Sequence, residues 1–249
     1  MRVEFLGTGG FHPSEQRHTA CLMLPELGLI FDAGTSAFRV EKHVETTSLD
    51  LFLSHAHLDH ICGLTYLITL PLLGKVEQIR LHARTEILDA VKIQLFSEQV
   101  FPVPPPFKFC EIQDEGELRL PSGQKLEWMK LNSHPGGSTA FKLHLDEGVF
   151  AYVTDTTVDG SYTDFIRGAE TLVHECYFPD SKSDWANQTG HTHSTALATL
   201  AKEAQVGRLI IVHTDPLDKT GDPIGIEEMR AIFPDIVIAE DKTSLELGK

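Results

Sequence analysis

The 249-residue sequence contains no uninterrupted apolar stretch of the ~18 residues that a membrane-spanning helix requires. Residues 2–7 read RVEFLG, which is typical of a β-strand and differs from the charged region and apolar run of a secretory signal peptide. From the lack of both patterns we expect a protein that does not associate with membranes. We also expect it to reside in the cytoplasm.

Cysteine is scarce, and no two cysteines form a C-x-x-C pair, so the sequence shows neither a zinc ribbon nor a dithiol redox motif. Disulfides are disfavoured in a reducing cytoplasm. Each cysteine is expected to pack as a small apolar side chain, although two of them are neighbours of candidate metal-binding residues. The four are Cys21, Cys62, Cys110 and Cys176, of which Cys62 and Cys176 have such neighbours.

Basic residues are outnumbered, because 21 Lys and Arg stand against 36 Asp and Glu and leave a net charge of −15. A strongly acidic surface repels a phosphate backbone and weakens nonspecific binding of RNA or DNA. The remaining composition, with 41% hydrophobic and 23% charged residues, is ordinary for a globular protein. Because no repeat, low-complexity tract or linker interrupts the chain, we predict one domain over residues 1–249.

Strands and helices alternate along the chain, but several strands follow one another without an intervening helix after residue 107. Such a run argues against a doubly wound parallel sheet and favours two mixed β-sheets packed face to face with helices outside. Strands are expected near residues 2–6, 19–24, 28–32, 50–54, 78–82, 107–112, 125–131, 138–145, 148–154, 171–175, 209–212 and 236–240. Helices are expected from residue 59 and over residues 84–97, 161–168, 194–206 and 224–233.

The segment Phe101–Phe107 reads FPVPPPF and is too rich in proline for a helix or a central strand. One interpretation is a rigid extended connector. The other is an apolar lip or a contact between subunits of a homodimer, because a phenylalanine stands at each end of the segment.

Histidines and an aspartate gather directly after one apolar strand. The strand ends at Ser54, and three histidines and an aspartate follow within six residues: His55, His57, Asp59 and His60. While the chain is extended, alternate side chains point the same way, which brings the first two histidines to one side. Imidazole and carboxylate are the ligands that zinc and related divalent metals take. The pattern therefore predicts a metal site.

The spacing His55-x-His57-x-Asp59-His60 resembles the signature of the metallo-β-lactamase superfamily. The resemblance implies an α/β protein with a four-layer αββα sandwich, which is the metallo-β-lactamase fold with two mixed β-sheets, and usually two bound metal ions. Further residues match that family's motifs in order, each at the end of an apparent strand or at the start of the loop after it. They are Asp32, His134, Asp155 and His213.

The resemblance also implies a ligand set. One metal ion would be held by His55, His57 and His134, and the other by Asp59, His60 and His213, with Asp155 between them. Asp32 would orient a ligand from outside the coordination sphere. Histidine and carboxylate suit Zn²⁺, and Mn²⁺ or iron takes the same ligands, so we expect two divalent ions and zinc first among them.

Three segments resemble the tRNase Z group within that superfamily. Residues 7–17 read GTGGFHPSEQR and are similar to the group's Gly-Thr-Gly…Pro-Ser…Arg opening. His174-Glu175 is similar to the start of its His-Glu-Ala-Thr segment, and His193-Ser194-Thr195 to its His-Ser-Thr segment. A glycine-rich turn, a strand end and a helix cap would explain the same residues locally. His191 lies two residues before His193 and competes with it for the assignment.

The resemblance implies roles for these residues in hydrolysis. Asp59 would be both a metal ligand and the proton acceptor for the attacking water. His193, oriented by Glu175, would protonate the leaving alkoxide, which is otherwise a poor leaving group. These three residues are the predicted catalytic groups.

The sequence also departs from tRNase Z. Bacterial members of that group carry a long basic arm between the third histidine and the bridging aspartate, whereas only residues 135–154 separate His134 from Asp155. The last histidine is followed by TDPL and not by the usual Ser-Arg-Tyr. We therefore predict a phosphodiesterase for a small phosphodiester or nucleotide, such as a cyclic nucleotide.

Other functions fit the same motifs. Processing of tRNA 3′ ends through a different surface is the first alternative, and it is disfavoured by the acidic charge and the missing arm. A thioester or lactone hydrolase and a metal-binding protein without turnover are the next two. The tRNase Z relatives are often dimers, which supports the homodimer interpretation of Phe101–Phe107.

Overall fold

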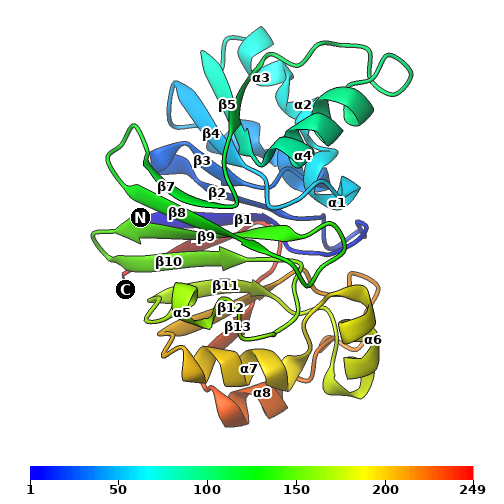
Figure 1. The fold of residues 1–249 in the computed structure, drawn as a ribbon, viewed down its shortest axis with the longest axis vertical. Coiled ribbons are helices and arrows are strands. Elements are labelled where there is room, and N and C mark those ends of the chain that lie inside the picture. Colours follow the sequence, from blue (N-terminus) through cyan, green and yellow to red (C-terminus); the bar gives the residue numbers. More distant parts are fainter. Residues whose placement is uncertain (249) are drawn as a thin grey trace. The chain divides into compact units, whose positions relative to one another are not determined.

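The computed structural model describes residues 1–248 (Figure 1). By their contacts they form two compact units. The first comprises Met1–Asp114 with Glu240–Glu246, and the second comprises Glu115–Ala239 with Leu247 and Gly248. Each unit contains one seven-stranded mixed sheet, so the prediction of two mixed β-sheets is confirmed.

The sheet of the first unit has the order β14-β1-β2-β3-β4-β5-β6. Its strands from β3 to β6 run parallel, and the remaining pairs are antiparallel. Parallel strands bring their carboxyl ends to one edge, where ligand-binding groups are commonly found. The strands are β1 (Arg2–Gly7), β2 (Cys21–Leu24), β3 (Leu29–Phe31), β4 (Ser48–Phe52), β5 (Gln78–Ala83), β6 (Phe107–Glu111) and β14 (Thr243–Glu246).

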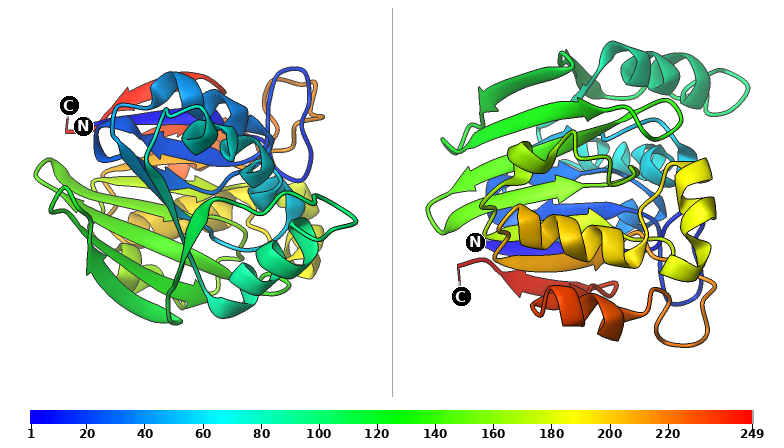
Figure 2. Two further views of the ribbon diagram at one scale, coloured as in Figure 1. Left: turned by 90° about the horizontal axis from the view of Figure 1, so that it is seen from above. Right: turned by 60° about the horizontal axis from the view of Figure 1, so that its bottom comes forward.

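Short helices cover one face of this sheet. Alternate residues of β4 and β5, including Leu49, Leu51 and Leu81, pack with them in one core cluster. Figure 2 shows the helices gathered along the blue and cyan strands. They are η1 (Pro25–Leu27), η2 (Thr35–His43), α1 (Leu58–Ile61), α2 (Leu64–Leu67), α3 (Thr69–Leu72), α4 (Thr85–Asp89) and the π-helical η3 (Ala90–Leu95).

The sheet of the second unit has the order β13-β12-β11-β10-β9-β8-β7. Here β10 to β13 run parallel, and β7 to β10 form an antiparallel meander. The strands are β7 (Glu115–Arg119), β8 (Lys125–Leu131), β9 (Ser138–Leu145), β10 (Gly148–Val153), β11 (Thr171–Glu175), β12 (Arg208–Val212) and β13 (Ile236–Ile238).

Helix α7 carries the clearest amphipathic pattern of the sequence, and its apolar face is buried as that pattern predicts. Leu197, Leu200 and Ala201 pack in one cluster with Leu209 and Ile211 of β12. Burying each such leucine or isoleucine contributes about 1.5–3 kcal/mol. Figure 1 shows α7 and α8 beside each other along this sheet. The helices of the unit are α5 (Thr163–Ile166), η4 (Asp180–Lys182), α6 (Ser183–Thr189), α7 (Ser194–Glu203) and α8 (Ile226–Ile232).

Several elements were not predicted. Strands β7 and β14 lie at sheet edges, where most of their side chains are polar and exposed, so they lack the apolar alternation that marks a half-buried strand. Helix α6 and the turns α2 and α3 are only four to seven residues long, which is too short for a periodic pattern to identify them. The nine-residue 3₁₀-helix η2 was also not predicted. None of the described helices is both long and apolar enough to span a bilayer.

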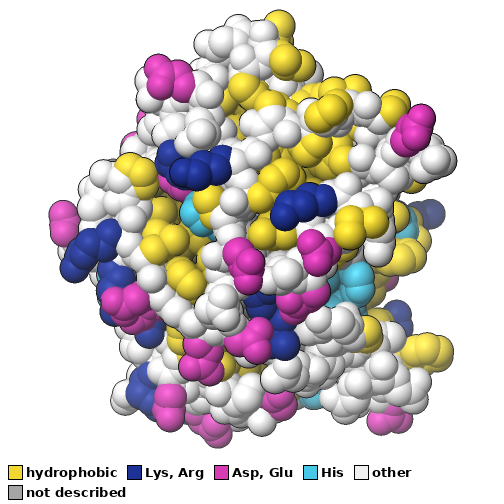
Figure 3. All heavy atoms as spheres, turned by 45° about the horizontal axis from the view of Figure 1, so that its top comes forward, with side chains coloured by type: hydrophobic (Ala, Val, Ile, Leu, Met, Phe, Trp, Pro, Cys, Tyr) yellow, Lys and Arg dark blue, Asp and Glu magenta, His cyan; other side chains and the backbone are white. Residues whose placement is uncertain are grey.

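The proline-rich segment forms neither helix nor strand over residues 101–106. Its flanking rings turn toward the first unit's core, because Phe96 packs edge-on against both Phe101 and Phe107, with centroids 5.6 and 6.1 Å apart. This packing favours the connector interpretation. Exposed apolar side chains of the first unit include Leu72, Leu73 and Ile93. Figure 3 shows hydrophobic side chains gathered on one face of the molecule.

A buried ionic network joins β4 to β5 just before the histidine-rich loop. Asp50, which is 3% exposed, accepts hydrogen bonds from Arg80 Nε at 2.6 Å and His82 Nε2 at 2.8 Å. The His82 ring also stacks on Phe52, with centroids 4.2 Å apart. Burial alone would raise the pKa of Asp50, but the hydrogen bonds from Arg80 and His82 outweigh it and lower that pKa.

We expect Asp50→Asn to lower the free energy of unfolding by about 1–3 kcal/mol, because Arg80 and His82 lose a charged acceptor. A carboxylate with a lowered folded-state pKa stabilises above its ordinary pKa, and this contribution is lost as the pH falls through the lowered value. The difference between the proteins should therefore shrink in acid, as urea unfolding at several pH values would show. Glu41→Gln in the exposed pair with Lys75 is the control and should change little. A difference that stays constant into acid would contradict the ionic explanation.

Candidate metal centre

In the first unit, the candidate ligands are positioned by a buried aspartate at the end of β3. Asp32 is fully buried and accepts hydrogen bonds from the backbone N–H of Ser54 at 2.7 Å and from its hydroxyl at 2.9 Å. His60 Nδ1 lies 2.9 Å from the other carboxylate oxygen of Asp32. Because a carboxylate accepts, this ring donates from Nδ1 and leaves Nε2 as its acceptor atom. That arrangement is typical of a metal-binding histidine.

The four residues of the motif converge at this point. The His55 ring lies 4.6 Å from the His57 ring and 4.2 Å from the His60 ring, measured between centroids. His60 Nε2 is 3.4 Å from an Asp59 carboxylate oxygen, which also accepts the backbone N–H of Phe11 at 3.0 Å. The structure thus gathers three imidazoles and one carboxylate in the loop after β4 and the first turn of α1.

Close backbone packing holds this turn in place. Ala33 N–H donates to the His60 carbonyl at 2.7 Å, and Gly63 N–H donates to the Ala33 carbonyl at 2.8 Å. A Cβ atom on Gly34 would lie only 2.1 Å from the Asp59 carbonyl oxygen. Only glycine therefore fits at position 34, and its presence lets the histidine loop approach the end of β3.

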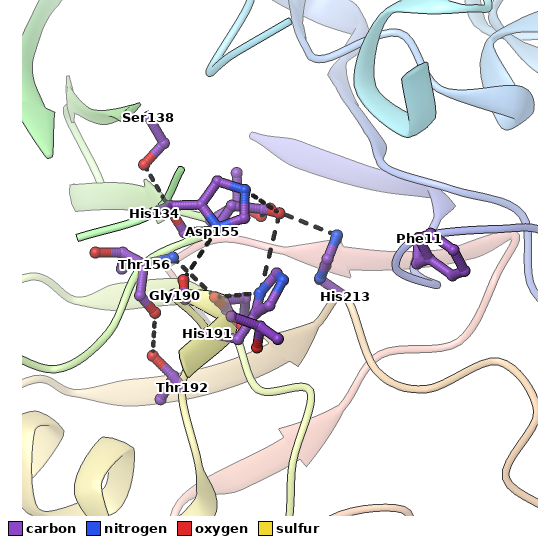
Figure 4. A network of polar contacts seen from close by, with 12 residues as sticks. Phe11, His134, Ser138, Asp155, Thr156, Gly190, His191, Thr192 and His213 are labelled. Atoms are coloured by element: carbon purple, nitrogen blue, oxygen red, sulfur yellow. Dashed lines mark hydrogen bonds and ion pairs between the residues drawn. The ribbon is translucent and has the colours of Figure 1, made fainter. Parts of the chain in front are cut away.

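The second unit carries its own converging donors at the ends of its strands (Figure 4). His213 Nε2 lies 3.4 Å and His134 Nε2 lies 3.7 Å from the carboxylate of Asp155. The His134 Nδ1 donates to the Gly190 carbonyl at 3.1 Å, which leaves its Nε2 as the acceptor. Donor atoms of Asp155, His191 and His213 all lie within 4.8 Å of one another.

The backbone at two of these positions is left-handed. Asp155 has φ of 48° and His213 has φ of 53°, which is the left-handed region that L residues other than glycine, asparagine and aspartate seldom adopt. Asp32 in the first unit has φ of 58°. Residues other than glycine in this region cluster at functional sites. The three aspartate and histidine positions at strand ends are therefore marked by backbone conformation as well as by chemistry.

The partner of Glu175 differs from the prediction. Glu175 is fully buried, and its carboxylate accepts hydrogen bonds from His191 Nδ1 at 3.0 Å and from the backbone N–H of Thr156 at 2.8 Å. His193, which was expected to pair with Glu175, instead lies 2.6 Å from Asp180. The reason is local: His193 precedes the first turn of α7, where Asp180 also accepts the N–H of Thr195.

Two buried, uncharged side chains, His174 and Tyr162, form a hydrogen-bonded chain that ends at the Glu175 carbonyl. His174 Nδ1 donates to the Glu175 carbonyl at 2.7 Å, so its Nε2 accepts from the Tyr162 hydroxyl at 2.9 Å. Burial lowers the pKa of His174 and raises that of Tyr162, which keeps both side chains uncharged. No motif indicated Tyr162 as a site residue, because its contact with His174 depends on how the start of α5 packs against β11.

These residues fit a divalent metal. Each unit presents carboxylate oxygens next to imidazole nitrogens that are left as acceptors by hydrogen bonds at the opposite ring nitrogen, as His60 and His134 show. Such donors suit zinc and related ions, and a bound cation would offset the charge of the clustered carboxylates. The His and Asp groups therefore suit a metal site in the described part of the chain.

Comparison with known proteins agrees with this chemistry. Residues 1–220 match the family model described as anti-Pycsar protein Apyc1. The ribonuclease Z of Archaeoglobus fulgidus is 25% identical over 302 aligned positions, which cover 99% of this chain and 98% of that protein. The resemblance to the tRNase Z group is thereby confirmed.

Solved structures show the same fold. The metallo-β-lactamase fold protein YhfI from Bacillus subtilis aligns with a TM-score of 0.80 and 20% identity, covering 98% of this chain and 99% of that one. The short form of human tRNase Z aligns with a TM-score of 0.75 and 20% identity over 99% of both chains. The predicted metallo-β-lactamase fold is confirmed, and the protein is a metal-dependent hydrolase. The chain belongs to the family described as anti-Pycsar protein Apyc1.

Proposed function

We propose that this hydrolase is a two-metal phosphodiesterase that cleaves a small phosphodiester, such as a nucleotide or a cyclic nucleotide. The proposal assigns one ion to His55, His57 and His134 and the other to Asp59, His60 and His213, with Asp155 between them. Zinc suits these ligands first, and manganese or iron would take the same set. Bound ions of this kind activate water and stabilise charge on a phosphoryl oxygen.

The observation that carries the proposal is the pair of His191 and Glu175 beside the donors of the second unit. Glu175 accepts a hydrogen bond from His191 Nδ1, and its carboxylate would stabilise the doubly protonated ring, so the proton that this imidazolium can transfer is the one on Nε2. A phosphodiester with an alkoxide leaving group needs such an acid. We therefore propose His191 as the proton donor, in the role that the sequence assigned to His193, and Glu175 as the residue that orients it.

Asp59 is the proposed proton acceptor for the attacking water. Its carboxylate is partly exposed, and Phe11 N–H holds one of its oxygens at 3.0 Å. Acid and base are then separate groups, as hydrolysis of a poor leaving group requires.

Three observations favour a small substrate. Residues 135–154 are almost filled by β9 and β10 and their tight turn, so the second unit has no basic arm at this position. The alignment with the Archaeoglobus ribonuclease Z spans 302 positions, more than the 249 residues of this chain, so that relative contains segments that this chain lacks. A net charge of −15 further weakens the binding of a large polyanion.

Processing of tRNA 3′ ends is the second candidate function. It is favoured by one observation, the likeness to a protein named ribonuclease Z over nearly the whole length of both chains. It would require a tRNA-binding surface elsewhere than between β9 and β10.

An assay panel on metal-loaded protein separates these functions. It contains bis(p-nitrophenyl) phosphate, several cyclic nucleotides, a precursor tRNA with a 3′ trailer, and a thioester. We expect turnover of the nitrophenyl diester and of at least one cyclic nucleotide, and about two metal ions per chain by elemental analysis. Cleavage of precursor tRNA alone would replace the proposal with the second candidate. Hydrolysis of the thioester alone, or fewer than about one ion per chain, would contradict the two-metal phosphodiesterase.

A further inference from the structure

Phe11 is conspicuous in the loop that joins β1 to β2. Its side chain is 73% exposed, the largest exposed fraction among the large hydrophobic residues of the described chain. Single exposed hydrophobic residues are common and by themselves indicate no function. The backbone conformation and the neighbours of Phe11 distinguish it from such residues.

The backbone of Phe11 is held in an unfavourable conformation. Its φ is 63°, in the left-handed region that a bulky side chain rarely adopts, although Gly10 stands directly before it. The surrounding loop is anchored, because Gly9 N–H donates to the His18 carbonyl at 2.9 Å and Ser14 N–H to the Arg17 carbonyl at 2.7 Å. Strain that persists in an anchored loop is typical of functional segments.

This conformation places Phe11 beside the candidate metal ligands of the first unit. Its N–H donates to the Asp59 carboxylate at 3.0 Å. The residue that carries the ring is therefore hydrogen-bonded directly to a proposed metal ligand and base. The His12 ring packs edge-on against the Phe11 ring, with centroids 5.4 Å apart and planes at 71°. An exposed aromatic face is therefore presented next to the reacting groups.

We propose that the Phe11 ring stacks on the nucleobase of the substrate, next to the phosphodiester that is cleaved. This inference rests on the proposed phosphodiesterase function and narrows its substrate class to nucleotides. Stacking on an aromatic side chain tolerates any base, because every base has a π-face, and it does not depend on positive charge. A protein with a net charge of −15 needs such an uncharged source of affinity for an anionic substrate.

Two diesters with the same leaving group test the proposal on the metal-loaded protein. Thymidine 5′-(p-nitrophenyl) phosphate carries a base, and methyl p-nitrophenyl phosphate does not. We expect Phe11→Leu to raise KM for the thymidine ester by about 5- to 100-fold and to change KM for the methyl ester by no more than about twofold. Phe11→Trp should keep the lower KM for the thymidine ester. Phe38→Leu, at another exposed phenylalanine of the first unit, is the matched control and should leave the ratio of the two KM values unchanged.

Binding provides a readout that does not need turnover. The Phe11→Trp protein should show fluorescence quenching by cytidine monophosphate beyond that of the wild type, and none by ribose 5-phosphate. If the wild type hydrolyses neither ester, the phosphodiesterase proposal fails, and quenching still tests the stacking. If the wild type is active but Phe11→Leu affects both esters equally, or if the base produces no extra quenching, the stacking proposal is overturned.

Discussion

Replacing His191 with Ala is expected to lower kcat for a diester with an alkoxide leaving group by about 10²- to 10⁴-fold. The reason is that His191 Nδ1 is held by Glu175 at 3.0 Å, which fixes the ring and leaves Nε2 to protonate the departing oxygen. A p-nitrophenolate leaves without that proton, so turnover of bis(p-nitrophenyl) phosphate should fall far less. Steady-state kinetics on a cyclic nucleotide and on the nitrophenyl diester measure the two effects.

His193→Ala is the matched control for this prediction, because it removes the same ring two residues along the chain. His193 is bound to Asp180 and not to Glu175, so its loss should change the two substrates by similar and small factors. Glu175→Gln should resemble a weaker form of His191→Ala, since an amide can still accept from Nδ1 but carries no charge. If His193→Ala, and not His191→Ala, selectively lowers turnover of the substrate with the poor leaving group, the acid role belongs to His193 as the sequence suggested.

The sequence could predict most of the candidate ligands because each lies at a strand end. His55, His57, Asp59 and His60 lie within six residues, from the loop after β4 into the first turn of α1, so their proximity follows from spacing alone and the structure has them together. In the second unit, an apolar strand before Asp155 and another before His213 mark the same edge of a sheet. Parallel strands necessarily bring such positions together.

The partner of Glu175 could not be predicted in the same way. His191 and His193 are two residues apart in a short segment between α6 and α7, so spacing does not distinguish them. The choice depends on Gly190, whose left-handed conformation ends α6, and on Asp180, which binds His193. Both are tertiary features, and a sequence pattern with a period of two or 3.6 residues carries no information about them.

In the fold, too, elements with a periodic apolar face could be predicted, and elements held by backbone pairing could not. Helix α7 and strand β12 are buried on a periodic apolar face and were predicted near their observed positions. Strand β7 has the sequence EGELR, and its place in the sheet is fixed by its antiparallel pairing with β8. Stabilisation of an edge strand by backbone pairing leaves little trace in side-chain hydropathy, which is why β7 and β14 were missed.

Asp155→Asn is expected to reduce kcat/KM for every phosphodiester by roughly 10³-fold, which corresponds to about 4 kcal/mol of transition-state stabilisation. In the second unit, the Asp155 carboxylate lies between His134 and His213, at 3.7 and 3.4 Å from their Nε2 atoms, and the proposal places it between the two ions. Asparagine has the same size and also tolerates the left-handed backbone at φ of 48°, so the fold should survive while the charge is lost.

Elemental analysis and kinetics on the same samples check this prediction. The Asp155→Asn protein should hold fewer ions per chain than the wild type at equal metal concentration, with a similar unfolding midpoint once both are stripped of metal. Asp164→Asn, in an exposed pair with Arg167, serves as the control and should change neither quantity. Because a bridging carboxylate affects both ions, its loss should reduce turnover of activated and poor leaving groups alike, unlike the loss of His191. An Asp155→Asn protein that keeps its metal content and its activity would exclude Asp155 as a ligand and would contradict the proposed two-metal arrangement.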